Sequence, residues 1–289
     1  MSRFALAQGS RTARLAGSVG VLVRIELLKL LKRRIFWVAV VLFALLATMK
    51  FAIASVAVGE EMAFLLVPPG SWPATLAIPA SIGPAFVGLL VIALFAPEFT
   101  WRTARQSVID GLGVDRYYAA KCITVLALSA LSVILALVLG FIGAAVGPVE
   151  WESNGLGAGD VQFLASYTAA SLMAGAAGLW LSCTLRAGAP AMVAFIGYVV
   201  AEPIAAAILG GRSELLDVVL RYLPAGLATA LGNRMAHYPE ALPGVLEMAE
   251  VVGMSPPGTA PVKGLLIAVH VYVVVLFAAG YATMRYRDL

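Results

Sequence analysis

Long apolar stretches recur along this 289-residue chain, and short segments rich in charge, glycine and proline separate them. A helix needs about 20 mostly apolar residues to cross the hydrocarbon layer of a membrane. The stretches that meet this requirement are Ile35 to Val58, Ala74 to Ala96, Cys122 to Val146, Val161 to Leu185, Ala189 to Leu209 and Gly264 to Met284. The pattern therefore predicts an all-α, polytopic membrane protein, with six transmembrane helices in a single domain over residues 35–289.

The segment before the first span, residues 1–34, has a different pattern. Between Val19 and Leu31 apolar residues recur near helical spacing, while Arg24, Glu26 and Lys29 mark a polar side. This spacing predicts an amphipathic helix that lies in the membrane interface. A plain basic stop signal that only sets the topology is the simpler interpretation, and it stays open.

Composition agrees with a membrane location. Hydrophobic residues make up 61% of the chain and charged residues 12%, against about 45–50% and about 25% in soluble domains. With the amino terminus in the cytoplasm, basic residues gather on the cytoplasmic side and acidic residues on the opposite side, which is the positive-inside pattern. We expect a multi-pass protein of the cell membrane with both termini in the cytoplasm. The same distribution explains the net charge of +4 without a nucleic-acid partner.

The longest non-spanning stretch, residues 210–263, follows the fifth span on the predicted outer side. Within it, Ser213 to Leu231 keeps helical apolar spacing that Pro224 interrupts. We expect short outer helices there, interfacial or partly re-entrant, before the sixth span.

Residue types that support catalysis or metal binding are scarce. ATP binding needs a glycine-rich loop that ends in Gly-Lys-Ser or Gly-Lys-Thr, and no lysine of this chain follows a glycine. His237 and His270 stand apart from each other and from both cysteines, so we expect no metal site. We expect no cofactor on this chain and no enzymatic activity of its own.

The fifth span carries the residue that is most costly to place in lipid, Glu202. Either it lines a polar translocation path where Pro203 kinks or breaks the helix, or the helix ends near it and the carboxylate reaches outer water. In the same span, Gly197, Ala201 and Ala205 form a stripe of small residues that allows close approach of another helix. That helix could belong to this chain or to a second copy.

The most specific local feature is the segment from Glu98 to Lys121, on the predicted cytoplasmic side between the second and third spans. Charged and aromatic residues alternate in it around a Gly-Leu-Gly break. A short helix over Thr100 to Ile109 would present Arg102 and Arg105 to a partner or to lipid. A solvated connecting loop is the alternative.

The same segment contains, in order, an acidic residue, a Thr-Leu-Arg-like run, a glycine, an arginine and a lysine. These are Glu98, Thr103-Ala104-Arg105, Gly113, Arg116 and Lys121. With its place after the second of six spans and the basic "RIELLKLLKRR" before the first span, this segment resembles the permease subunits of ABC-2-type (type V) ABC transporters. One departure is Arg102, because a glycine commonly precedes the threonine in that family.

The resemblance implies a cytoplasmic coupling helix between spans 2 and 3, under which a separate ABC ATPase subunit docks with its ATP and Mg. The chain would be the permease of an ATP-driven exporter of an amphipathic substrate such as a drug, peptide or lipid, and it would pair with a second copy as a homodimer. The coupling residues would be Glu98, Arg102, Thr103, Arg105, Gly111, Gly113 and Arg116. Two alternatives stay open: an ion- or proton-coupled carrier that uses Glu202 and His270, and a membrane-embedded enzyme.

Overall fold

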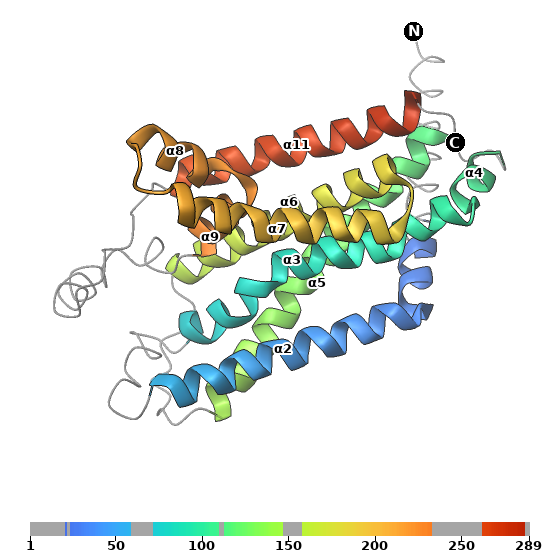
Figure 1. Cartoon of the computed structure of the whole chain (residues 1–289). Helices are drawn as coiled ribbons and strands as arrows, with labels where there is room; N and C mark the ends of the chain where they lie inside the picture. Colours follow the sequence, from blue (N-terminus) through green and yellow to red (C-terminus); the bar gives the residue numbers. More distant parts are fainter. Residues whose placement is uncertain are drawn as a thin grey trace, which may run out of the picture.

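The computed structural model describes residue 21 and residues 24–58, 72–109, 113–146, 158–232 and 262–286. Its helices are α2 (Arg34–Val58), α3 (Trp72–Thr100), α4 (Thr103–Ser107), α5 (Val114–Val146), α6 (Ala158–Leu185), α7 (Gly188–Leu209), α8 (Glu214–Tyr222), α9 (Pro224–Gly232) and α11 (Val262–Tyr286) (Figure 1). Residues 24–32 form a further helical segment directly before α2. No strand occurs in these described ranges, which confirms the all-α prediction.

Most of these helices have the length and apolarity of membrane spans. Five stretches meet both conditions, and the bent pair α8 and α9 raises the number to as many as six. The five are Ala80–Thr100, Val114–Ile142, Gly159–Leu185, Gly188–Leu209 and Val262–Tyr286. The chain is therefore a polytopic helical membrane protein. α2 lies outside this set, but it matches the first stretch predicted from the sequence, and its 25 residues would extend about 37 Å. The count of six spans stays a prediction.

Two helices extend beyond their predicted spans by four or more residues, both at the same end of the bundle. α3 continues to Thr100 instead of ending at Ala96, and α5 begins at Val114 instead of Cys122. Hydropathy places the end of a span where charge begins. Here the two helices continue into charged residues. Two of these residues, Glu98 and Lys121, pair with each other inside the fold.

α3 and α6 form the centre of the bundle, and α2, α5, α7, α9 and α11 pack around them. The two central helices approach closely: a Cβ atom on Gly178 would lie 2.5 Å from the carbonyl oxygen of Gly88. Small residues let membrane helices bring their backbones together in this way. Val91 and Leu179 are buried beside this contact region in the largest apolar cluster.

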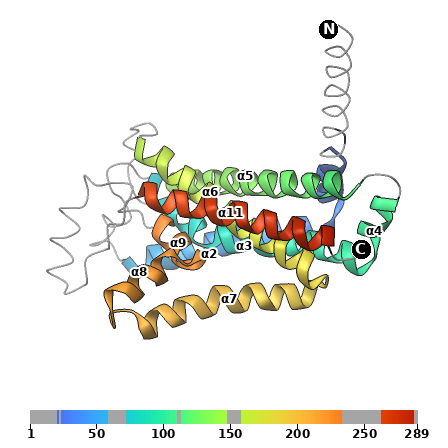
Figure 2. The ribbon, with the colours of Figure 1, turned by 90° about the horizontal axis from the view of Figure 1, so that it is seen from above.

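α4 marks one end of the bundle, which we name the α4 end, and the opposite end carries α8 and α9 (Figures 1 and 2). Residues 24–32 lie at the α4 end, since Glu26 contacts Lys121 near the start of α5. The last turns of α11 lie there too, because the Tyr281 hydroxyl donates to Asp115 Oδ1 at 2.6 Å. The described parts of the chain therefore begin and end on one side of the bundle. Which side of the membrane this is stays a prediction.

α7 runs along one edge of the bundle (Figure 2). Only Ala191, Phe195 and Glu202 of this helix are buried. Pro203 lies inside the helix, which continues to Leu209. The expected break or end of the helix near Glu202 was therefore wrong, because a proline removes one backbone hydrogen bond and the turns on both sides still form.

The two short helices before α11 meet at a sharp bend of 84°. Ser213 caps α8, with its hydroxyl accepting the Leu216 N–H at 3.3 Å. Pro224 begins α9, a position that suits proline because its missing N–H has no partner inside the helix. Leu227 and Leu231 of α9 are buried in a cluster with residues of α6 and α11. Short helices interrupted at Pro224 are thus confirmed; their interfacial or re-entrant placement stays a prediction, and residues 233–261 lie outside the described residues.

Candidate functional site

α4 follows α3 after a reversal of the chain at Arg102. This residue has φ 58° and ψ 15°, a left-handed conformation that glycine adopts at least cost. Thr103 Oγ1 donates a hydrogen bond to the Glu98 carbonyl oxygen at 3.2 Å, which ties the start of α4 to the end of α3. The coupling helix predicted over Thr100 to Ile109 is shorter than expected, because Thr100 belongs to α3.

The side chains around α4 point mostly away from the protein. Ala104 is the buried residue of this helix, while Trp101 is 69% exposed and Ile109 is 66% exposed. We name the exposed set Trp101, Arg102, Thr103, Arg105 and Ile109 the α4 surface. Tryptophan and arginine are enriched in the centres of protein interfaces, so this surface has the composition of a docking site.

The other residues predicted to take part in coupling include both exposed and buried ones. Gly113 and Arg116 are exposed at the start of α5, and Gly113 has φ 73°, which glycine tolerates. Gly111 lies outside the described residues. Glu98 does not belong to the α4 surface: it is only 5% exposed and its carboxylate points into the protein. Any part it has in coupling must pass through the groups it binds.

Those groups form a cluster at the α4 end that we name the charge cluster, consisting of Glu26, Lys29, Arg33, Glu98 and Lys121. Lys121 lies at its centre and is only 1% exposed. Its Nζ atom is 2.7 Å from Oε2 of Glu26 and 2.8 Å from Oε2 of Glu98. A buried ammonium group is costly unless it is paired and hydrogen-bonded, and here two carboxylates satisfy it.

Aromatic and cationic neighbours complete the surroundings of Glu98 and Lys121. The Tyr117 hydroxyl donates to Glu98 Oε2 at 2.6 Å, and Arg33 Nη2 lies 3.4 Å from Glu98 Oε1. The Lys121 ammonium lies 4.7 Å from the ring centre of Phe95 and 4.9 Å from that of Tyr117, which adds cation–π attraction. The charge cluster is therefore fully connected across α3, α5 and the segment before α2.

Residues 24–32 contact the bundle through one face. Glu26 and Leu30 are buried, four residues apart, while Ile25, Leu28 and Leu31 are exposed. Burial alone would raise the pKa of Glu26, but the nearby ammonium groups of Lys121 and Lys29 outweigh it and hold the pKa below its ordinary value of 4.5. The predicted amphipathic helix is thus present over these residues, and its place in the membrane interface stays a prediction.

Glu202 lies near the opposite end of the bundle and is 6% exposed. Its carboxylate accepts the backbone N–H groups of Ala225 at 3.1 Å and Gly226 at 2.5 Å, and it also accepts the hydroxyl of Tyr198. The two amides belong to the first turn of α9, where N–H groups have no partner inside the helix and the helix dipole favours negative charge. Glu202 therefore acts as a cap supplied by a distant segment, and it joins α7 to α9.

The other predicted path or contact residues lie on the same helix as Glu202. Gly197 and Ala201 are exposed and Ala205 is half-buried, and a Cβ atom on Gly197 would meet nothing within 4 Å. Within the described residues, this stripe of small residues is therefore open. Its use as a translocation path or as a contact with a second copy stays a prediction.

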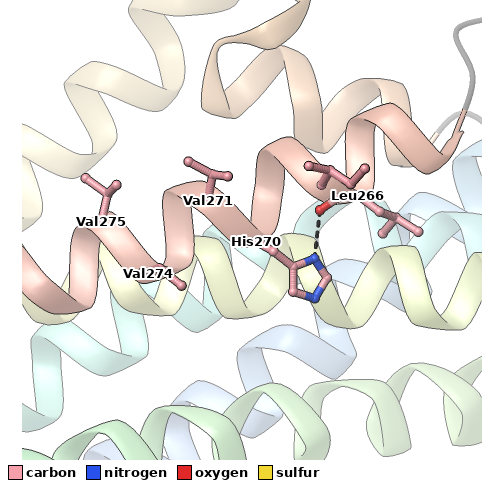
Figure 3. Close-up of a pocket in the computed structure, with 6 residues that line it drawn as sticks. Leu266, His270, Val271, Val274 and Val275 are labelled. Atoms are coloured by element: carbon pink, nitrogen blue, oxygen red, sulfur yellow. Dashed lines mark hydrogen bonds between the residues drawn. The ribbon is translucent and has the colours of Figure 1, made fainter.

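His270 is the other ionisable residue of the carrier interpretation, and its use in a relay with Glu202 stays a prediction. It is exposed on α11, and its Nδ1 atom is 2.7 Å from the carbonyl oxygen of Leu266, one turn earlier (Figure 3). The hollow around it is lined by apolar residues of α11 alone, Leu266, Ile267, Val271, Val274 and Val275. Across the described part of the chain, no group of three or more His, Cys, Asp or Glu side chains could hold a metal ion.

Comparison with known proteins identifies no relative of this chain by family model or among curated proteins. The class that the fold defines is that of polytopic α-helical membrane proteins.

Proposed function

We propose that this chain is the membrane-spanning permease subunit of an ATP-driven exporter of the ABC-2 type, which works with a separate ATPase subunit. The observation that carries the proposal is the α4 surface. The helix α4 lies between two predicted spans at one end of the bundle (Figures 1 and 2). The α4 surface exposes a tryptophan and two arginines there. The resemblance of this segment to permease coupling segments gives the same function.

The connections of α4 support a mechanical role. Thr103 joins it to the end of α3, and α3 packs against α6 at the centre of the bundle. A force on α4 would therefore reach the central helices through the Thr103–Glu98 hydrogen bond and the packing of α3 against α6. Closure of a docked ATPase on ATP would shift the spans as rigid bodies, which is a common way of switching between two states.

The apolar edges of the bundle fit the expected substrate and assembly. α7 exposes apolar side chains such as Val193 and Ile208 over most of its length, so lipid or a second copy must cover them in a membrane. A homodimer with twofold symmetry would place the same helix of two copies together. An amphipathic substrate, such as a drug, peptide or lipid, would pass along this boundary beside Gly197, Ala201, Glu202 and Ala205.

A first experiment tests the partnership directly. The tagged chain is purified from membranes in mild detergent, its co-purifying proteins are identified, and ATP hydrolysis that orthovanadate inhibits is measured. We expect a phosphate-loop ATPase to co-purify with the chain and hydrolysis to increase in its presence. If the folded chain is recovered without any ATPase from cells that also express the products of its neighbouring genes, the proposal is wrong.

A second experiment tests the docking surface. Arg105→Glu should leave membrane insertion and thermal stability unchanged, because Arg105 is exposed. It should weaken recovery of the ATPase by about thirtyfold, since an interface arginine that contributes strongly to binding is worth about 2 kcal/mol. Arg212→Glu is the matched control, an exposed arginine at the other end of the bundle. Equal ATPase recovery with both variants would exclude docking at α4.

The main alternative, an ion- or proton-coupled carrier, has a separate test. Vesicles that contain the purified chain alone are given a proton or sodium gradient without nucleotide. Transport under this condition favours the carrier, and ATP-dependent transport only with the partner subunit favours the permease. The contacts of Glu202 with Ala225 and Gly226 already assign this carboxylate a bonding role that needs no ion movement.

A further inference from the structure

Lys121 joins three parts of the chain that lie far apart in the sequence. Its ammonium group binds Glu26 of the amino-terminal segment, 95 residues away, and Glu98 of α3, 23 residues away. α3 and α5 are the two helices on either side of α4, so the Lys121–Glu98 pair closes the base of the α4 loop. The Lys121–Glu26 pair then attaches residues 24–32 to that base.

We propose that Lys121 is a positioning residue that makes residues 24–32, the end of α3 and the start of α5 move as one unit with α4. This inference rests on the proposed function and adds to it the route by which movement of α4 reaches the amino-terminal segment and α2. The route is short, because Arg33 follows that segment, donates to the Leu94 carbonyl oxygen and Glu98, and directly precedes α2.

The attachment of residues 24–32 depends strongly on this pair. Of their side chains, Glu26 and Leu30 are the buried ones, and the remaining apolar residues face outward. Leu30 contributes apolar contact, which has no preferred direction. The Glu26–Lys121 ion pair at 2.7 Å supplies the directional contact that fixes the position of the segment along and around its axis.

The geometry also offers a mild way to detach the segment. In Glu26→Gln, Lys121 keeps both oxygens of Glu98, at 2.8 Å and 2.9 Å, so no buried charge loses all its partners. The amide of glutamine keeps the shape of the side chain and one oxygen acceptor. The variant should therefore fold, and a change in its behaviour would reflect the weakened attachment.

The experiment compares Glu26→Gln with Lys29→Gln after reconstitution of the chain with its ATPase in vesicles. Lys29 also pairs with Glu26, at 3.0 Å, but its side chain is 47% exposed, so its loss should matter little. We expect Glu26→Gln to hydrolyse ATP at the normal rate while substrate moved per ATP falls about fivefold or more, which is the lower end of the usual coupling between sites. A purely structural ion pair would lower thermal stability and leave this ratio unchanged.

A distance measurement gives a second readout that needs no transport. Spin labels at Leu28→Cys and Ile109→Cys, both exposed in the native chain, report the separation of the amino-terminal segment from the α4 surface. We expect one narrow distance with Lys29→Gln, with and without nucleotide, and a broadened distribution with Glu26→Gln. If Glu26→Gln shows normal transport per ATP and a narrow distance, the role of Lys121 and Glu26 is wrong, while the proposed function is unaffected. Failure of the unchanged chain to recover an ATPase overturns the proposed function itself, while the labels still report whether Glu26 holds the segment.

Discussion

Each end of the bundle buries carboxylates, and the groups that pair with these carboxylates differ between the two ends. At the α4 end, Glu26 and Glu98 share the ammonium group of Lys121. At the opposite end, two backbone amides of α9 and the hydroxyl of Tyr198 donate hydrogen bonds to the buried carboxylate of Glu202. Both solutions keep a charged group inside a largely apolar protein.

Because their partners differ, the two ends should respond differently to amino-acid substitution. A cluster built on one lysine is vulnerable at that lysine, because its loss leaves two buried anions without their main partner. A cap built on backbone amides keeps its donors in every substitution except one by proline, so the acceptor is the group that most substitutions can remove. The α4 end should therefore behave as a single block, while the junction of α7 and α9 should loosen locally.

The largest expected effect comes from removing the shared cation. Lys121→Met leaves Glu26 and Glu98 buried beside each other, and breaking a buried pair costs about 3–5 kcal/mol. We expect a large fall in the thermal unfolding midpoint in detergent. Lys50→Met is the matched control: this lysine is exposed in α2 and donates to Ser81 Oγ at 2.7 Å, so its loss should cost about 0.5 kcal/mol or less. Similar midpoints for the two variants would contradict a central role for Lys121.

The sequence predicts the long apolar helices well because hydrophobicity is a local property. The stretch around α7 was expected at Ala189 to Leu209 and is observed at Gly188–Leu209. Neither carboxylate solution could be predicted in this way, since Glu26 meets Lys121 across 95 residues and Glu202 meets Gly226 across 24. Such contacts depend on how helices pack, and a single sequence carries no signal of that packing.

Two local signals nevertheless pointed toward these sites. Glu26 is the lone acid in a basic amphipathic segment, and an acid in that position needs a reason to be there. Pro224 is typical of the first position of a helix, which implies that a cap for α9 must come from somewhere. Glu202, already costly in lipid, was the nearest acid in a predicted span. The two observations together make Glu202 a candidate cap for α9, but the contact itself depends on how α7 and α9 pack.

The intermediate effect is expected at the Glu202 cap. Glu202→Ala removes the acceptor for the Ala225 and Gly226 amides, and loss of a helix cap costs about 0.5–2 kcal/mol. We expect faster hydrogen exchange at these amides and through α9, with α3 and α6 unchanged. Glu202→Gln keeps one oxygen and should fall between the two proteins.

Glu214→Gln is the control for this comparison, because Glu214 is an exposed acid in the first turn of α8. It removes a negative charge from the neighbouring helix without touching the α9 amides. If Glu202→Ala leaves exchange at Ala225 and Gly226 as slow as in the control, the cap does not hold α9 and the contrast between the two ends is lost.

The smallest effect is expected from acidity at the α4 end. Lys121 and Lys29 hold the pKa of Glu26 below its ordinary value of 4.5, so this carboxylate stabilises the folded state fully above the unfolded pKa. That stability is lost only as the pH falls through the lower pKa of the folded state. The difference in thermal midpoint between the native chain and Glu26→Gln should therefore be equal at about pH 7 and about pH 5.5, and it should shrink only below about pH 4.5. A difference that already shrinks between the first two values would mean that Glu26 takes up a proton in the folded protein, and that Lys121 does not hold it as an anion.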